Sequence, residues 1–164
     1  MGRFEQIYEE HREAIRAYLQ RRAPESLVED VLSETFLVCW RNLDRVPDEP
    51  LPWLYAVARK TLANQRRKLA REQRAGVAEP PSAVVEPEPV GDTVLAAAFA
   101  ALSERDREVL RLVAWEGLSL SRAAVVLGCS ALTCRVRYHR AKTRLARRLE
   151  ATETFRGDLK GAMR

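Results

Sequence analysis

The sequence predicts an all-α protein made of two small helical domains joined by a flexible linker rich in proline and glutamate. Along most of the chain, apolar residues recur three and four positions apart, which is the period of an amphipathic helix. Residues 75–92 instead hold four prolines and four acids without one basic or aromatic residue, a composition that buries too little apolar surface to stay ordered. We therefore expect domains at residues 1–74 and 93–150, a linker at 75–92 and a polar tail at 151–164.

Three helices are expected in the first domain. The first runs from Phe4 to about Arg22. The second runs from about Leu27 to Leu43, because Ser26 followed by Glu29 has the spacing of a capping box. Three prolines between Asp44 and Pro52 predict a loop, and Pro52 suits the first position of the third helix. The inward side of the second helix is expected to carry Val28, Val31, Leu32, Thr35, Phe36, Cys39, Trp40 and Leu43.

The third helix becomes basic beyond Ala58. Its cations are opposed by one acid, Glu72, so this helix is a candidate nucleic-acid surface; they are Arg59, Lys60, Arg66, Arg67, Lys68, Arg71 and Arg74.

The second domain ends in the pattern of a helix-turn-helix. After a helical stretch from Thr93 to Glu116, closed by Gly117, a short helix carries Leu120, Ala123, Ala124 and Leu127 on one side. Gly128 can take the left-handed conformation that ends a helix, and Ser130 can cap the next one. This arrangement predicts a recognition helix that starts just after Ser130.

The recognition helix is strongly basic. Seven cations and no acid lie between Ser130 and Leu149, so we expect a polyanionic partner. Arg135, Val136, His139 and Arg140 share a stripe near its start, where such a helix enters the major groove and arginine can bind guanine O6 and N7. The other cations are expected to hold phosphates, and a solvated basic face on a packing helix is the plainer alternative.

Composition narrows the remaining possibilities. The net charge of +5 divides into +2 for residues 1–74, −4 for 75–92 and +7 for 93–164. No apolar run approaches the ~20 residues of a membrane span and the N-terminus is too polar for a signal peptide, so we expect a cytoplasmic protein without membrane insertion. Cys39, Cys129 and Cys134 are expected to be small core residues, and neither a metal nor a cofactor is expected.

Three motifs, in order and at suitable separation, resemble those of the extracytoplasmic-function (ECF) sigma factors, a class of bacterial RNA polymerase specificity subunits. EDVLSETFLVCWRNLD resembles the D-x-x-Q-E-x-F-x-x-x-W helix, and PLPWLYAVARKTLANQRRK resembles the W-L-x-x-I-A-R-N-x-x-x-D-x-x-R-R segment. The stretch from Ala101 to Leu145 resembles the L-P-x-x-x-R-x-v-x-x-L and G-T-V-K-S-R-L-H-R-A-R stretches. Ser33 stands where glutamine is usual, Lys60 and Asn64 where the family tends to have Asn and Asp, and Val136 where it has serine.

The resemblance implies a role for each domain. The first would bind the β′ clamp of the core polymerase through Asp30, Ser33, Glu34 and Trp40. Its third helix would recognise and open the −10 promoter element, using Trp53, Tyr55, Lys60, Asn64, Arg66 and Arg67. The second domain, which the β flap would hold, would read the −35 element with Thr133, Arg135, Val136, Arg137, His139, Arg140 and Arg144. An anti-sigma factor is a further implied partner.

Two other classes of function are open at this stage. An autonomous helix-turn-helix regulator would present two symmetric heads to a palindromic site, and the chain offers no evident dimerisation coiled coil. An enzyme has weaker support, because the chain has no glycine-rich phosphate loop and its two histidines, His11 and His139, are far apart.

Overall fold

The structure, a computed structural model, describes residues 2–76 and 93–162, with side chains placed at 2–76 and 94–151. All regular secondary structure in these ranges is helical, so the predicted all-α fold is confirmed. The chain divides into two compact units, Met1–Glu86 and Pro87–Arg164, and each is described by itself. Nearly all of the predicted linker, from residue 77 to 92, lies outside the described residues.

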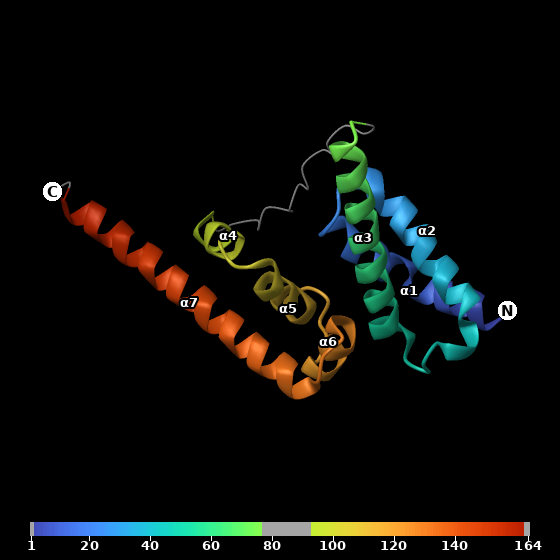
Figure 1. Ribbon diagram of the computed structural model, residues 1–164. Coiled ribbons are helices and arrows are strands. Elements are labelled where there is room, and N and C mark those ends of the chain that lie inside the picture. Colours follow the sequence, from blue (N-terminus) through green and yellow to red (C-terminus); the bar gives the residue numbers. More distant parts are fainter. Residues whose placement is uncertain (1, 77–92, 163–164) are drawn as a thin grey trace. The chain divides into compact units, whose positions relative to one another are not determined.

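The N-terminal unit is a bundle of three helices (Figure 1). Helices α1 (Arg3–Gln20), α2 (Glu25–Arg41) and α3 (Pro50–Arg74) each pack on the other two. Apolar side chains from all three meet in the core, where the fully buried ones include Ile15, Tyr18, Leu19, Val31, Cys39 and Leu54. The Thr35 hydroxyl, also buried, donates to the carbonyl of Val31 at 2.6 Å and so satisfies its own polarity.

Helix α2 begins earlier than the capping-box pattern predicts. Pro24 is the N-cap, no side chain caps the helix, and the Leu27 N–H donates to the Pro24 carbonyl at 2.9 Å. Ser26 therefore lies inside the first turn, and its prediction as the cap is wrong. Proline cannot donate a backbone hydrogen bond but its carbonyl can accept one, so the helix starts directly after it.

The connection between α2 and α3 is tied to the start of the chain. A short 3-10 helix, η1 (Leu43–Arg45), follows α2. The Arg3 guanidinium donates to the carbonyls of Leu43, Val46 and Pro47 at 3.0, 2.6 and 3.2 Å. Helix α3 starts at Pro50, two residues before the predicted start, because proline is tolerated in the first turn.

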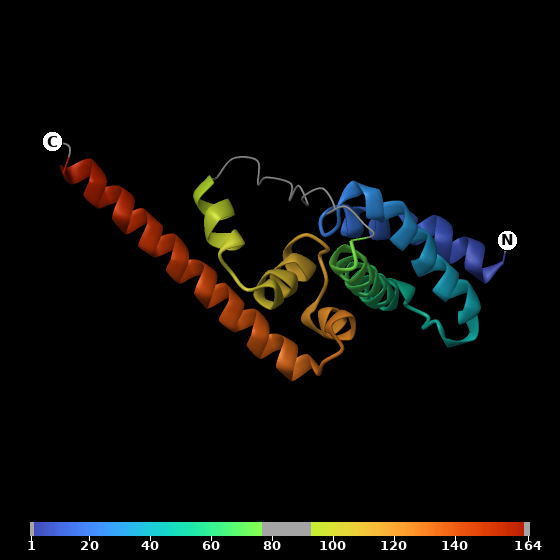
Figure 2. The same cartoon turned by 45° about the horizontal axis from the view of Figure 1, so that its top comes forward.

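The C-terminal unit contains α4 (Thr93–Ala100), α5 (Glu104–Ala114), α6 (Leu120–Leu127) and α7 (Ala131–Ala162). Figure 2 shows the three shorter helices along one side of α7, and each of them contacts it. The buried apolar side chains include Leu102, Val109, Leu112, Leu118, Ala123, Ala124, Cys134 and Ala141. Ala123, Ala124 and Ala141 are small, which lets α6 and α7 approach closely.

The turn between α6 and α7 confirms the sequence pattern. Gly128 has φ +64° and ends α6, and the Ser130 hydroxyl accepts from the Thr133 N–H at 3.1 Å, which caps α7. Ser103 caps α5 in the same way by accepting from the Asp106 N–H at 3.2 Å. The predicted helix-turn-helix is present.

One expectation for this unit is wrong. Helix α7 runs on to Ala162, so the expected separate tail is largely the end of the recognition helix. Trp115 is the residue after α5 and is 45% exposed. Its ring packs beside Phe99 with centroids 5.6 Å apart, which covers one face and leaves the other open.

Candidate nucleic-acid interfaces

The first turns of α7 present an exposed face that carries most of the predicted recognition residues. Arg135, Val136, His139 and Arg140 are all exposed, and Thr133 is exposed beside the capping Ser130, with 2.9 Å between the two hydroxyl oxygens. On the opposite side Cys134 and Ala141 are fully buried against the domain. The Ser130 cap fixes the start of the helix, and the buried seam fixes which side faces out.

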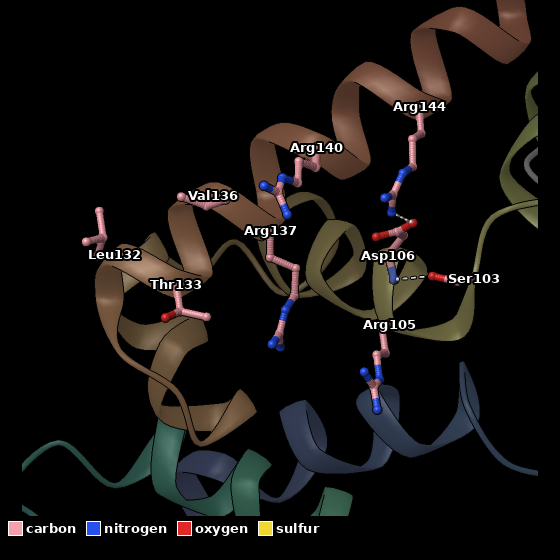
Figure 3. Close-up of a pocket in the computed structure, with 9 residues that line it drawn as sticks. All are labelled: Ser103, Arg105, Asp106, Leu132, Thr133, Val136, Arg137, Arg140 and Arg144. Carbon is pink, nitrogen blue, oxygen red and sulfur yellow. Dashed lines mark hydrogen bonds and ion pairs between the residues drawn. The ribbon is translucent and has the colours of Figure 1, made fainter.

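A recess of about 480 Å³ lies between the start of α5 and this face of α7 (Figure 3). Four arginines line it, Arg105 from α5 and Arg137, Arg140 and Arg144 from α7, together with Leu132, Thr133 and Val136. Among the described residues no carboxylate pairs with Arg135, Arg137 or Arg140. Unneutralised guanidinium groups around a recess fit phosphate oxygens.

Arg144 differs from the other predicted contacts. It donates to the Asp106 carboxylate at 2.7 Å, as Figure 3 shows, and Asp106 is 8% exposed whereas Arg144 is 56% exposed. The basic run has no acid among its neighbours in the sequence, and this partner lies 38 positions away on another helix, so the sequence pattern did not reveal it. Arg144 serves first to hold α7 to α5.

On α3, four of the six predicted melting residues share one side of the helix. Trp53, Lys60, Asn64 and Arg67 follow each other at spacings of seven, four and three, which bring them onto one stripe. Trp53 is half-buried and the other three are exposed. Arg67 donates to the Asn64 side-chain oxygen, so these two act as a pair. The stripe combines one aromatic ring with two cations, the composition that single-stranded DNA prefers.

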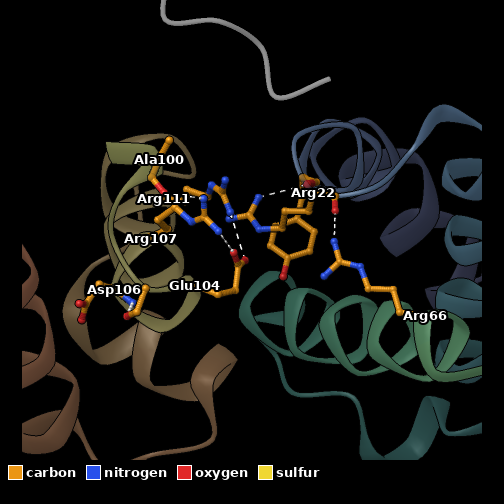
Figure 4. A network of polar contacts seen from close by, with 9 residues as sticks. Arg22, Arg66, Ala100, Glu104, Asp106, Arg107 and Arg111 are labelled. Atoms are coloured by element: carbon orange, nitrogen blue, oxygen red, sulfur yellow. Dashed lines mark hydrogen bonds and ion pairs between the residues drawn. The ribbon is translucent and has the colours of Figure 1, made fainter. Parts of the chain in front are cut away.

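The other two predicted melting residues, Tyr55 and Arg66, lie on the side of α3 that faces α1. Tyr55 is 3% exposed, and its ring centroid is 5.0 Å from that of Tyr18. Arg66 donates to the carbonyl of Arg22 just beyond α1 (Figure 4). A buried ring cannot stack on a base, so the prediction for Tyr55 is wrong. Arg66 is still exposed, but its guanidinium holds the end of α1.

The predicted polymerase-binding residues lie on the outer side of α2. Trp40 is 59% exposed, against the expectation that it faces inward. It lines a groove of about 400 Å³ between α1 and α2 together with Ser33, Phe4, Tyr8, Leu32, Phe36 and Leu37. Asp30 is exposed and Glu34 half-buried, one turn apart, on the stripe next to this groove. The ion pair of Arg16 and Glu29 also lines the groove, so largely apolar side chains lie beside charged ones here, which suits a protein partner.

The three cysteines are free thiols. Cys39 and Cys134 are buried as predicted, and burial raises the pKa of both thiols above the ordinary value. Cys129 is partly exposed in the turn before α7, against the expectation of a core position. Within the described ranges no three potential metal ligands come together, and no helix is long and apolar enough to cross a membrane.

Sequence reasoning missed two kinds of residue. Arg105 lies 30 or more positions before the other cations of the recess, and no local pattern connects it to them. Leu132 is 70% exposed, one turn before Val136, and that spacing was a signal available in the sequence.

Two family models match the chain, and together they cover both units. Residues 7–72 match Sigma-70 region 2, and residues 93–145 match Sigma-70, region 4. The RNA polymerase sigma factor NccH of Alcaligenes xylosoxydans xylosoxydans is 30% identical, over 92% of this chain and 88% of that protein. This chain belongs to the ECF sigma factors. The ECF RNA polymerase sigma factor SigL of Mycobacterium tuberculosis is 27% identical over 82% of each chain.

Solved structures of sigma factors have the same fold. The sigma factor RpoE of Bartonella quintana, crystallised with the anti-sigma factor NepR, superposes with a TM-score of 0.66 at 26% identity, over 90% of this chain and 96% of RpoE. The structure of CnrH in complex with the cytosolic domain of CnrY gives 0.60 at 30% identity, over 90% and 88%. As an ECF sigma factor, the chain is an RNA polymerase subunit for promoter-specific transcription, and an autonomous regulator is not favoured.

Proposed function

We propose that the two units divide the work of promoter recognition. The C-terminal unit binds the −35 element as duplex through the exposed face of α7, and the N-terminal unit binds the −10 element as an opened strand through α3. The observation that carries this proposal is the contrast between the two surfaces. The face of α7 is a run of exposed arginines on a helix anchored for groove entry, whereas the stripe on α3 adds Trp53 to its cations.

The direct contacts on α7 are Arg135, His139 and Arg140, with Thr133 and Arg137 at the phosphates. Arginine is the residue best suited to guanine, because two of its N–H groups match O6 and N7. On α3 the contacts are Trp53, Lys60, Asn64 and Arg67. Tyr55 is buried and is not part of the α3 surface. Arg66 stabilises the N-terminal unit through the Arg22 carbonyl, and Arg144 stabilises the C-terminal unit through Asp106.

Binding to the core polymerase falls to α2. Trp40, Ser33, Asp30 and Glu34 form one continuous outer surface, with the groove beside α1 open to an apolar side chain of the partner. An exposed tryptophan beside a groove is typical of the centre of a protein interface, and the two carboxylates fit its polar rim. We assign this surface to the polymerase clamp and leave the β flap to the C-terminal unit.

We further propose that the factor works in the cytoplasm, carries no catalytic activity of its own and is held inactive by an anti-sigma factor. RpoE and CnrH were both solved with a bound protein, in the first case an anti-sigma factor by name. The chemistry of RNA synthesis then belongs to the polymerase alone.

A pull-down with the core polymerase tests the interface on α2. Asp30→Arg with Glu34→Arg should lower core binding at least tenfold while helicity and melting temperature stay close to wild type, because both side chains lie outside the core. Glu25→Arg, an exposed acid at the start of the same helix, is the matched control and should bind normally. Normal binding by the double variant would show that this surface of α2 does not bind the core polymerase.

A further inference from the structure

Two exposed aliphatic side chains interrupt the basic face of α7. Leu132 is 70% exposed and Val136 is 42% exposed, and they lie one turn apart at the start of the helix. Scattered apolar side chains are normal on a protein surface. The position of this pair is unusual, because both residues lie on the face of α7 that is proposed to enter the major groove of DNA.

The surroundings of the pair are cationic. Arg135 precedes and Arg137 follows Val136, and the pair lines the same recess as Arg105 and Arg140 (Figure 3). An apolar spot bordered by guanidinium groups is complementary to a ligand whose negative charges border an apolar group. The major groove of DNA has this character, since phosphates follow its edges and thymine methyl groups project into it.

We propose that Leu132 and Val136 read the C5-methyl groups of thymines in the upstream element, so that this factor selects thymine there by apolar contact. The inference rests on the proposed function of α7 as the recognition helix. Cytosine is disfavoured at the same place, because it lacks the methyl group and turns its N4 donor toward guanidinium groups that can only donate, whereas the O4 of thymine can accept from them.

The spacing of the two side chains suits neighbouring base pairs. Residues four apart on a helix are separated by about 6 Å along its axis. Base pairs are stacked about 3.4 Å apart. Leu132 and Val136 therefore reach methyl groups one or two steps apart, while Arg140, one turn further on, reaches the next bases.

Replacing thymine by deoxyuridine tests the proposal, since this change removes only the methyl group. Holoenzyme reconstituted with core polymerase first selects its upstream element from a duplex library randomised at that element. Binding of fluorescein-labelled duplexes is then measured with each thymine changed singly to deoxyuridine. At one or two thymines the dissociation constant of wild type should rise about three- to fivefold, the effect of burying one methyl group.

In Leu132→Ala with Val136→Ser the same deoxyuridine changes should have no effect, with a ratio near one. Val125→Ser is the matched control, because Val125 is 53% exposed on α6 and does not line the recess, and it should keep the wild-type ratio. Circular dichroism and the melting temperature of each variant report whether the domain still folds, as exposed positions lead us to expect.

Four results would overturn the inference. The first is a selected element without thymine, and the second is a wild-type dissociation constant that no deoxyuridine change raises. The third is a double variant in which deoxyuridine still raises the dissociation constant as in wild type. The fourth is a double variant that loses binding to core polymerase instead of DNA, which would make the pair a protein contact. Failure of the proposed function has a different signature, since the holoenzyme would then prefer no upstream sequence and Arg140→Ala would change nothing.

Discussion

Arg144 and Asp106 form an ion pair of 2.7 Å that joins the recognition helix to the first turn of α5, across 38 positions of the sequence. The carboxylate is nearly buried, while more than half of the arginine side chain is exposed. Asp106 also lies at the N-terminal end of α5, where the helix dipole favours a negative charge. A residue predicted to bind DNA is thus a link between two helices of its own domain.

Removing either partner should destabilise the C-terminal unit. Asp106→Ala and Arg144→Ala should each lower the free energy of unfolding by about 1 kcal/mol, since the pair is partly screened by solvent. Only Asp106→Ala frees a cation, so it alone should steepen the salt dependence of non-specific duplex binding, by about 0.9 in the log–log slope for one added phosphate contact. Denaturant titrations and salt titrations measure the two effects.

Asp106→Asn is the matched control, because it keeps the shape and the acceptor oxygen but removes the charge. Its loss of stability should be smaller than that of Asp106→Ala. If Arg144→Ala left stability unchanged and weakened DNA binding as strongly as Arg140→Ala, Arg144 would belong to the DNA contacts after all.

The turn of the helix-turn-helix depends on one glycine. Gly128 has φ +64°, and a Cβ built there would meet no atom within 4 Å. Gly128→Ala should therefore cost about 1 kcal/mol through backbone strain alone. Gly128→Asn should cost less, since asparagine tolerates the left-handed conformation better. Thermal unfolding of both variants decides this, and an alanine variant as stable as wild type would show that the turn can relax.

The buried thiols predict a pH dependence of stability. Burial raises the pKa of Cys39 and of Cys134 above the ordinary value of 9.0, so the folded state disfavours both thiolates. Their contribution to stability is fully present below that ordinary value and is lost as pH rises through the higher folded values. Denaturation midpoints should thus fall above about pH 9, and fall less in Cys39→Ala with Cys134→Ala.

Alkylation by iodoacetamide tests the burial of the same two thiols independently of pH. Partly exposed Cys129 should be alkylated first at pH 8, and Cys39 and Cys134 only when the protein unfolds. Equal labelling of all three thiols in the folded protein would contradict the core positions of Cys39 and Cys134.

Local patterns predicted the helices and the turn. Gly128 and Ser130 act within four residues of their own positions, so the sequence around them was sufficient to assign the turn. The same holds for the core of α2 from Val28 to Cys39, which periodicity identified. The prediction of Ser26 as the cap was wrong because two possible helix starts, Pro24 and Ser26, lie two positions apart, and the sequence pattern does not say which of them is used.

Long-range packing could not be predicted in this way. Periodicity does not say which side of a helix another helix will cover, so Trp40 was expected inside and is exposed, while Tyr55 was expected at the DNA and is buried. The Arg66 contact with the Arg22 carbonyl joins residues 44 positions apart. Arg144 was predicted to bind DNA, and its ion pair was missed because the partner, Asp106, lies on another helix.

The central claim is that α7 recognises duplex and α3 holds an opened strand. Arg140→Ala should weaken binding of the upstream duplex, because a good bidentate base contact is worth ~1 to 3 kcal/mol. Lys60→Ala with Asn64→Ala should leave binding of closed duplex nearly intact and impair strand opening, since the favourable contacts on α3 form only after base pairs separate.

Rescue by a pre-melted template measures this division most directly. Permanganate reactivity of thymines near the start site reports strand opening on the closed promoter template bound by holoenzyme, and run-off transcription reports activity on the pre-melted template. The account predicts that Lys60→Ala with Asn64→Ala loses reactivity on the closed template and regains transcription on the pre-melted one, and that Arg140→Ala is rescued much less. Equal rescue of both variants, or of neither, would contradict the assignment of recognition to α7 and strand opening to α3.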